Sequence, residues 1–182
     1  MNLTSHRRAI LLEMVAGETI DCNIPIKQDR VSSATMDDTE ASRVMQQKVI
    51  DAVAQTLLGT VAGFQIWMVN GQKLRLFDHD FTDGGNGARY LYIPRNQIWI
   101  EDGTKLEELA PFIVHEISEF KYMMAGASYD AAHEHANAIE GKLRRVLVSM
   151  AVRPHPLKAL GLAERYLGRF GPALPGCCCA KS

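Results

Sequence analysis

The chain has 182 residues, of which 47% are hydrophobic and 23% are charged, and its formal net charge is −1. This composition is typical of a globular protein with one domain and its own core, which we expect within residues 1–167. So small a net charge argues against nucleic acid or an anionic membrane as a partner. Glu13 interrupts the apolar run 9–12, which excludes a membrane span and argues against a signal peptide. We therefore expect a cytoplasmic protein.

The cysteines agree with that location. Three of the four are adjacent, at Cys177, Cys178 and Cys179, and Cys22 lies far from them in the sequence. Such a set cannot form a disulfide framework. A metal clip or a lipidation site is the alternative, but we interpret residues 168–182 as an exposed and disordered tail.

The first 62 residues predict two helices separated by a strand and a polar connector. Residues 5–16 favour a helix that Gly17 ends. Residues 19–26 alternate between apolar and polar, which predicts a strand that Pro25 restricts to a sheet edge. Residues 41–62 carry an apolar stripe at helical spacing, which predicts a helix that packs on the core.

Residues 64–100 predict a small sheet. Residues 64–69 and 72–77 flank Asn70-Gly71, the dipeptide most typical of a β-hairpin turn. Residues 78–87 are polar and glycine-rich, and their spacing does not match a calcium loop, so we interpret them as a turn. Two further strands are expected at 89–93 and 97–100. The pattern predicts an α+β fold in which a small antiparallel sheet packs against helices.

Two helices follow the strands and predict a helical hairpin. Thr104 is the expected N-cap of a first helix of about twenty residues. Gly126 is the expected end of this helix, and Ser128 the expected N-cap of the second. The second helix continues past Gly141 toward residue 152, and residues 157–167 predict a last short helix.

The hairpin contains three of the six histidines, and it brings them close to several glutamates. His115 and Glu119 are one turn apart on the first helix and share a face. His133 and Glu140 share a face of the second helix. Residues at equal distances from the turn of an antiparallel hairpin lie side by side, so these four groups converge.

Other polar residues of the hairpin lie near this point or away from it. Glu116 lies about 100° around the helix from His115, which places it at the flank of the converging groups. Asn137 shares the face of His133, whereas His135 lies off that face and is expected in solvent. Glu140 is either a fourth ligand or, as we prefer, the acceptor that holds His115 in one tautomer.

Apolar residues surround the first helix almost completely, which predicts that it is largely buried. A buried carboxylate without a partner is costly, and a metal ion or a hydrogen-bond network relieves that cost. A metal site is the interpretation we prefer. A metal-free polar network and an ordinary exposed face are the alternatives.

The segment His115–Glu119, with the sequence HExxE, resembles the HExxH motif of the zincin metallopeptidases in their small gluzincin-type form, over about residues 64–145. The resemblance implies that His115, Glu119 and His133 bind zinc and that Glu116 is the general base that activates water. Glu119 stands where the family has a second histidine. Zinc accepts a carboxylate ligand, although its charge weakens the metal as a Lewis acid. The layout is also similar to uncharacterised phage-encoded and bacterial proteins.

Three classes of function follow. The first is a zinc peptidase that binds a peptide or protein substrate along an exposed strand such as 97–100. The second is a non-catalytic, phage- or prophage-related structural or interaction protein, in which the metal or polar cluster only staples two helices. The third is a two-metal bundle, which needs more Glu-x-x-His pairs than the sequence contains.

Overall fold

The computed structural model describes residues 40–53, 55–150 and 155–170. The predictions for residues 1–39 and for the cysteine cluster lie outside these residues. In chain order the elements are α2 (Glu40–Ala52), β1 (Gln55–Val61), β2 (Phe64–Val69), α3 (Gly71–Leu74), β3 (Gly84–Asn86), β4 (Gln97–Glu101), α4 (Leu106–Met124), α5 (Tyr129–Met150) and α6 (Pro156–Phe170). A small sheet and a group of helices together confirm the α+β class.

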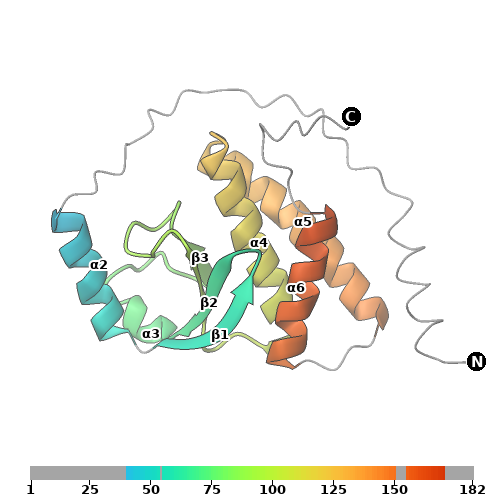
Figure 1. Ribbon diagram of the computed structural model, residues 1–182, viewed down its shortest axis with the longest axis horizontal. Coiled ribbons are helices and arrows are strands. Elements are labelled where there is room, and N and C mark those ends of the chain that lie inside the picture. The colour runs from blue at the N-terminus through green and yellow to red at the C-terminus, as the bar shows by residue number, and fades with distance from the viewer. Residues whose placement is uncertain (1–39, 54, 151–154, 171–182) are drawn as a thin grey trace, which may run out of the picture.

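The four strands form one sheet in the order β1-β2-β4-β3. β1 and β2 are antiparallel, as are β3 and β4, but β2 and β4 are parallel. The expected all-antiparallel sheet is therefore wrong, because residues 70–96 return the chain to the starting end of β2 before β4 begins. Figure 1 shows the sheet between α2 and α3 on one side and α4, α5 and α6 on the other.

β4 separates two hydrophobic cores. Ile98 and Ile100 pack in the larger core, which is shared with α4, α5 and α6. Trp99 faces the other way and packs in the smaller core with Val49 of α2 and Leu74 of α3. These three β4 side chains are fully buried, so β4 is an interior strand with both faces covered.

β1 corrects one sequence prediction. We expected a helix over 41–62, but the helix ends at Ala52 and Gln55–Val61 is a strand. The chain turns back at Ala62 and Gly63, whose φ angles of 49° and 86° are those of a two-residue hairpin turn. The register between β1 and β2 shifts at Gly59. The φ angle of Gly59 is 151°, a value that residues other than glycine rarely adopt.

The predicted hairpin turn at Asn70-Gly71 is also wrong, because Asn70 starts α3 instead. The Asn70 side chain accepts a hydrogen bond of 2.8 Å from the Lys73 backbone N–H, which is the N-cap arrangement. A side chain at position 71 would overlap that of Glu101, so glycine is needed there for packing. Residues 72–77 consequently continue as helix and turn rather than as a strand.

The third strand lies in a different place from the one predicted. Residues 89–93 form turns, and the strand beside β4 is Gly84–Asn86, within the stretch that we interpreted as a turn. The ring centroids of Tyr90 and Tyr92 lie 5.5 Å apart, and Tyr92 lies 6.0 Å from Trp99. These aromatic contacts hold residues 89–93 over the smaller core.

The helical hairpin formed by α4 and α5 is confirmed. α4 begins at Leu106 with Lys105 at its N-cap position, so Thr104 is not the cap. Gly126 ends the helix with φ of 94°, and the Ser128 hydroxyl accepts a hydrogen bond from the Ala131 N–H at 3.3 Å. α5 follows without a break to Met150.

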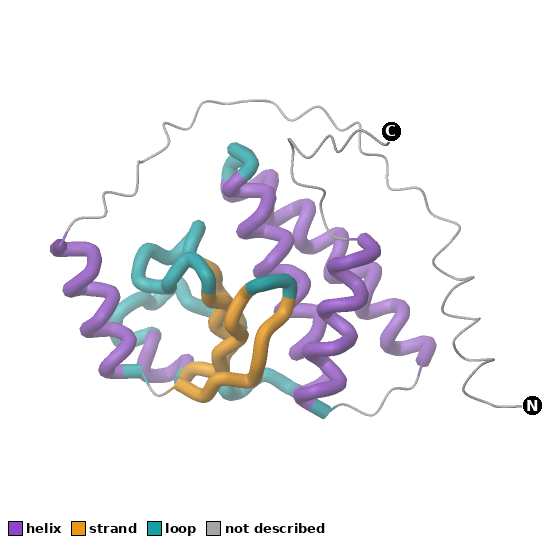
Figure 2. Tube along the Cα trace, viewed as in Figure 1, coloured by secondary structure: helices purple, strands orange, loops and turns teal. Residues whose placement is uncertain are grey.

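α6 runs from Pro156 to Phe170, so residues 168–170 of the predicted tail are helical. α6 packs on α4 and β1, and Figure 2 shows it in front of the crossing pair α4 and α5. No helix among the described residues is both long and apolar enough to cross a membrane.

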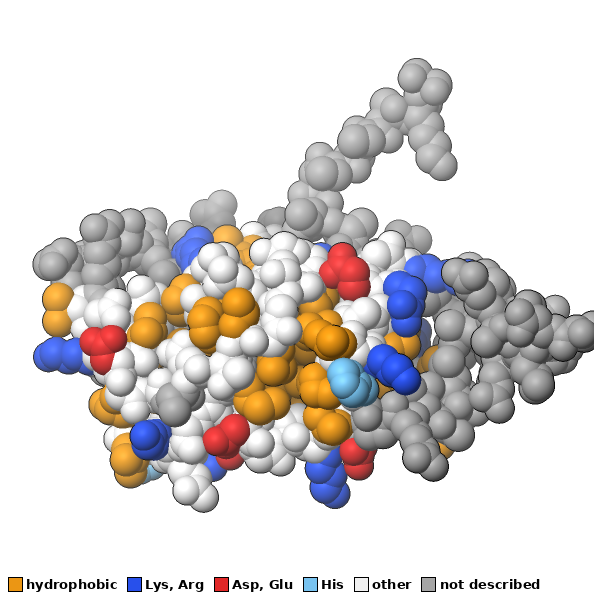
Figure 3. Space-filling model, turned by 60° about the horizontal axis from the view of Figure 1, so that its bottom comes forward, with side chains coloured by type: hydrophobic (Ala, Val, Ile, Leu, Met, Phe, Trp, Pro, Cys, Tyr) orange, Lys and Arg blue, Asp and Glu red, His pale blue; other side chains and the backbone are white. Residues whose placement is uncertain are grey.

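Hydrophobic side chains also reach the surface. Leu57, on the edge strand β1, is 49% exposed. Figure 3 shows hydrophobic side chains gathered over the middle of one face of the molecule. Part of the hydrophobic side chains therefore lies outside the two cores, in contact with solvent.

Candidate metal centre

The HExxE segment lies on α4 where that helix is buried almost all round. His115, Glu116 and Glu119 are 6%, 9% and 3% exposed. α4 packs against α5, α6, β3 and β4, which explains why apolar residues surround its polar ones. Three ionisable side chains are thus removed from water together, so each needs a partner.

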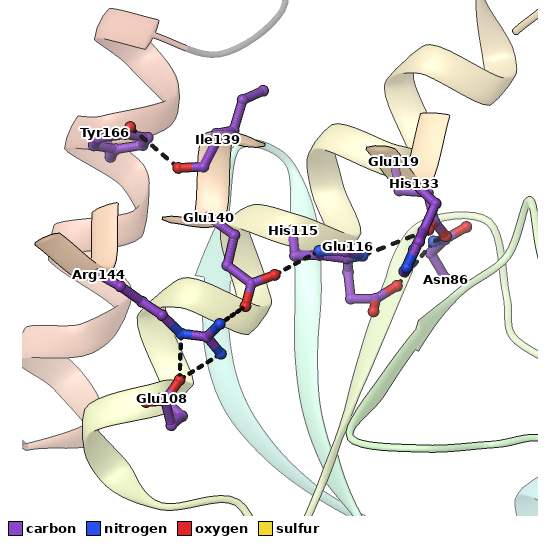
Figure 4. A network of polar contacts seen from close by, with 10 residues as sticks. All are labelled: Asn86, Glu108, His115, Glu116, Glu119, His133, Ile139, Glu140, Arg144 and Tyr166. Atoms are coloured by element: carbon purple, nitrogen blue, oxygen red, sulfur yellow. Dashed lines mark hydrogen bonds and ion pairs between the residues drawn. The ribbon is translucent and has the colours of Figure 1, made fainter. Parts of the chain in front are cut away.

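The partners come from α5. Glu140 Oε2 lies 2.6 Å from His115 Nδ1, and His133 Nδ1 lies 2.9 Å from Glu119 Oε2. Within α4, His115 Nε2 lies 3.5 Å from Glu119 Oε2. Figure 4 shows these side chains pointing toward one another from the two helices. The predicted convergence is therefore correct for His115, Glu119 and His133, and Glu140 joins them through the other nitrogen of His115.

His115, Glu119 and His133 form a group that could hold a metal ion. One ligand atom from each lies within 4.8 Å of the other two. Tetrahedral zinc, with bonds of about 2.0–2.2 Å, keeps its ligand atoms roughly 3.3–3.6 Å apart, so small side-chain movements suffice. Two imidazole nitrogens and a carboxylate oxygen are also donor types that zinc binds. The residues therefore fit a metal ion.

Glu140 contacts His115 from the side opposite Glu119. The Glu140 carboxylate contacts Nδ1 of the His115 ring, and the other ring nitrogen, Nε2, faces Glu119. Arg144 Nη1 lies 2.6 Å from the second oxygen of Glu140, and Arg144 Nη2 lies 2.6 Å from Glu108. The two ends of the Glu140 carboxylate are thus both held, which orients the His115 ring.

Asn86, at the end of β3, completes the cluster and was not predicted from the sequence. Its amide nitrogen donates to Glu116 Oε2 and to Glu119 Oε1, both at 2.9 Å. Its amide oxygen accepts from the backbone N–H groups of Ala88 at 3.0 Å and Arg89 at 3.2 Å. The buried Asn86 therefore ties both carboxylates to the loop that follows β3.

The glycines before Asn86 are the sequence feature that could have indicated this contact. A Cβ atom on Gly84 would lie 3.0 Å from Glu116 Oε1. Glycine thus lets β3 approach the buried face of α4 closely. An asparagine after two glycines is consistent with a polar contact at a close backbone approach.

The cluster changes the proton affinities of its members. Burial, together with the charge of Glu119, raises the pKa of Glu116 from 4.5 to about 7. Burial alone would lower the pKa of His115, but its contacts with Glu119 and Glu140 outweigh this and raise the pKa to about 10. Burial opposes ionisation of Glu119, yet hydrogen bonds from His115, His133 and Asn86 lower its pKa.

The cluster reaches the surface through His133, whose side chain is 43% exposed. The Tyr129 ring stacks on His133 with centroids 5.4 Å apart, and the Arg89 guanidinium carbon lies 4.3 Å from the Tyr129 centroid. His135, which we expected in solvent, is half-buried and stacks on Tyr122 at 4.6 Å. Asn137 is exposed and makes no hydrogen bond within the cluster among the described residues.

The proposed peptide-binding strand needs correction. Residues 97–100 belong to β4, which pairs with β2 on one side and β3 on the other. An interior strand has no free backbone groups for an added peptide. The edges of the sheet are β1 and β3.

Comparison of the chain with protein families, with curated proteins and with solved structures gave no match. The geometry of the cluster is therefore the basis for any functional argument.

Proposed function

We propose that the protein is a zinc-dependent peptidase whose metal ligands are His115, Glu119 and His133. The observation that carries this proposal is the convergence of their three ligand atoms within 4.8 Å, directly beside the buried carboxylate of Glu116. Zinc suits this donor set better than magnesium or calcium, which prefer oxygen ligands. The resemblance of HExxE to the zincin motif supports the same assignment.

Glu116 is the general base in this proposal. A base that works at neutral pH needs a pKa near 7, and the pKa of Glu116 is raised to about that value. Asn86 holds this carboxylate at one oxygen and leaves the other free to accept a proton. Zinc, when bound, would supply the Lewis acidity that makes water easier to deprotonate.

Glu140 and Arg144 orient His115. Glu140 binds Nδ1 at 2.6 Å, so the neutral tautomer with its proton on Nδ1 presents Nε2 as the ligand atom. Arg144 holds the Glu140 carboxylate in place through the contact of 2.6 Å. These two residues support the ligand set without belonging to it.

The experiment is zinc analysis combined with cleavage of an unbiased peptide library. Purified wild type is expected to hold about one zinc per chain after removal of all metal and back-titration. His115→Ala and His133→Ala should lose zinc, and Glu119→Gln should bind it more weakly. Glu116→Gln should retain zinc and lose cleavage. Equal zinc retention by the two histidine variants would refute the proposed ligand set.

A second function, a non-catalytic staple, is favoured by one specific observation. The contacts His115–Glu140 and Glu119–His133 both cross from α4 to α5, so the cluster joins the two helices whether or not it performs chemistry. In that case the ligand variants lower the melting temperature, and wild type binds zinc but cleaves no peptide. Cleavage by wild type that Glu116→Gln abolishes would exclude the staple as the whole function.

A further inference from the structure

Arg89 differs from Arg75 and Arg144 in that its guanidinium does not pair with a carboxylate of the described residues. Arg75 is paired with Glu101 at 2.7 Å, and Arg144 with Glu108 and Glu140. Arg89 is exposed, and among the described residues no carboxylate forms an ion pair with it. Its guanidinium instead lies over the ring of Tyr129 and hydrogen-bonds to that side chain. A guanidinium has five N–H donors in a planar fork, so this bond leaves others for a planar anion.

The backbone of Arg89 is tied to the metal centre. Its N–H donates to Asn86 Oδ1 at 3.2 Å, and Asn86 in turn donates to Glu116 and Glu119. The position of Arg89 therefore depends on the same asparagine that orients the proposed base. The hydrogen bond to Asn86 fixes the position of the Arg89 backbone, from which the side chain extends.

The side chain of Arg89 lies beside the part of the cluster that reaches the surface at His133. Its guanidinium carbon lies 4.3 Å from the centroid of Tyr129, whose ring stacks on the proposed ligand His133 at 5.4 Å. Stacking on an aromatic ring restricts a guanidinium and removes part of its water, which strengthens binding of an anion. Arg89 is thus a cationic group next to the exposed ligand His133.

We propose that Arg89, resting on Tyr129, binds a carboxylate of the peptide substrate. This inference rests on the proposed peptidase function and narrows it to substrates that carry a carboxylate near the reacting bond. The steps of 4.3 and 5.4 Å from Arg89 through Tyr129 to His133 limit their separation to at most about three extended residues, at roughly 3.4 Å each. The carboxylate is therefore the C-terminus or an acidic side chain within about three residues of that bond.

The carboxylates of the cluster do not compete for Arg89. Glu116 and Glu119 are buried and accept hydrogen bonds from Asn86. Glu140 forms an ion pair with Arg144 on the far side of His115. An incoming carboxylate meets the guanidinium first and the buried acids only behind it. Arg89 would thus bind the substrate at the surface, and the buried cluster with Glu116 would carry out the reaction.

The test measures binding rather than turnover. Four N-acetylated tetrapeptides are titrated by calorimetry into full-length protein, with zinc and with chelator: Ala-Ala-Phe-Ala as free acid and as amide, and Ala-Ala-Phe-Glu and Ala-Ala-Phe-Gln as amides. We expect the free acid, or the glutamate peptide, to bind about ten- to hundredfold more tightly than its neutral counterpart, as charged hydrogen bonds do. Which acid is preferred identifies the source of the carboxylate.

Matched variants assign the effect to Arg89. Arg89→Gln should abolish the preference for the acid while leaving the melting temperature within about 1 °C of wild type. Arg89→Lys should keep part of the preference. Arg165→Gln, an exposed arginine on α6, makes the same charge change elsewhere and should keep all of it.

Each outcome decides the question. Equal binding of acids and amides by wild type, no binding of any of the four peptides, or a preference that survives Arg89→Gln would overturn the inference. A preference that depends on Arg89 in a protein that binds no zinc and cleaves nothing would uphold the carboxylate site at Arg89 and refute the peptidase. A zinc-dependent peptidase that ignores the carboxylate would refute the inference alone.

Discussion

Glu116 provides the sharpest test of the electrostatics at the site. Its pKa is raised from 4.5 to about 7, first because it is buried and then because Glu119 is negatively charged nearby. A raised pKa means that the folded state binds the proton more tightly than the unfolded state. The stabilisation is therefore complete below pH 4.5 and is lost as the pH rises to 7.

The size of the effect follows from that shift. Between pH 4.5 and 7, ionisation of Glu116 costs the metal-free fold about 3 kcal/mol, at 1.36 kcal/mol for each pKa unit. Glu116→Gln removes the charge and can still accept the hydrogen bond from Asn86. We expect this variant to be more stable than wild type by up to about 3 kcal/mol at pH 8 and no more stable at pH 4.

The assay is urea unfolding of metal-free protein at pH 4, 6 and 8. Glu134→Gln, which changes an exposed carboxylate on α5, is the control and should show no such pH dependence. Zinc next to Glu116 would favour its ionised form, so added zinc should reduce the gain. A difference in stability between Glu116→Gln and wild type that is the same at pH 4 and pH 8 would refute the reasoning.

Three further predictions concern other groups. The contacts of His115 with Glu119 and Glu140 raise its pKa to about 10, so this imidazole must lose a proton before it binds zinc. The affinity for zinc should therefore rise with pH, and calorimetry in two buffers should detect release of about one proton per zinc bound. Hydrogen bonding to Arg75 lowers the pKa of Glu101, so Glu101→Gln should lower the urea midpoint at pH 7, an effect that fades as the pH falls below 4.5. Gly126→Ala should cost about 1 kcal/mol in thermal unfolding, since φ is 94° and no atom lies near the added methyl.

The helical hairpin could be predicted because its determinants are local. Gly126 and Ser128 mark the turn, and a loop this short favours an antiparallel pair of helices. The one-turn spacing of His115 and Glu119 then places both on one face. From these facts one can predict that His133 and Glu140 of the second helix lie beside His115 and Glu119.

The strands could not be predicted in the same way, because long-range contacts decide them. Residues 55–61 continue the helical apolar stripe of α2, yet the turn at Ala62-Gly63 pairs them with β2, and Leu57 ends up exposed. Asn70 serves equally well in a turn or as a helix cap. Its amide donates to Asp102 at 3.0 Å, a partner 32 residues later in the chain.

Asn86 was missed for a similar reason. Its contacts with Glu116 and Glu119 exist only after β3 has paired with β4 and α4 has packed against β3. The glycines before Asn86 indicate that the backbone can approach another element closely, but they do not say which element it approaches. The half of the site contributed by the hairpin was therefore predictable, whereas the half contributed by the sheet was not.

The two cross-helix contacts of the hairpin also limit how the gene can change over evolution. Glu119 meets His133 near the turn, and His115 meets Glu140 farther from it. One residue inserted between His133 and Glu140 would rotate the latter by about 100° and separate it from His115. Insertions in the loop at 125–128 leave both spacings intact. Distant descendants of this gene are thus expected to vary in that loop while keeping His-x3-Glu on one helix and His-x6-Glu on the next, a pattern by which they can be found after the rest of the sequence has diverged.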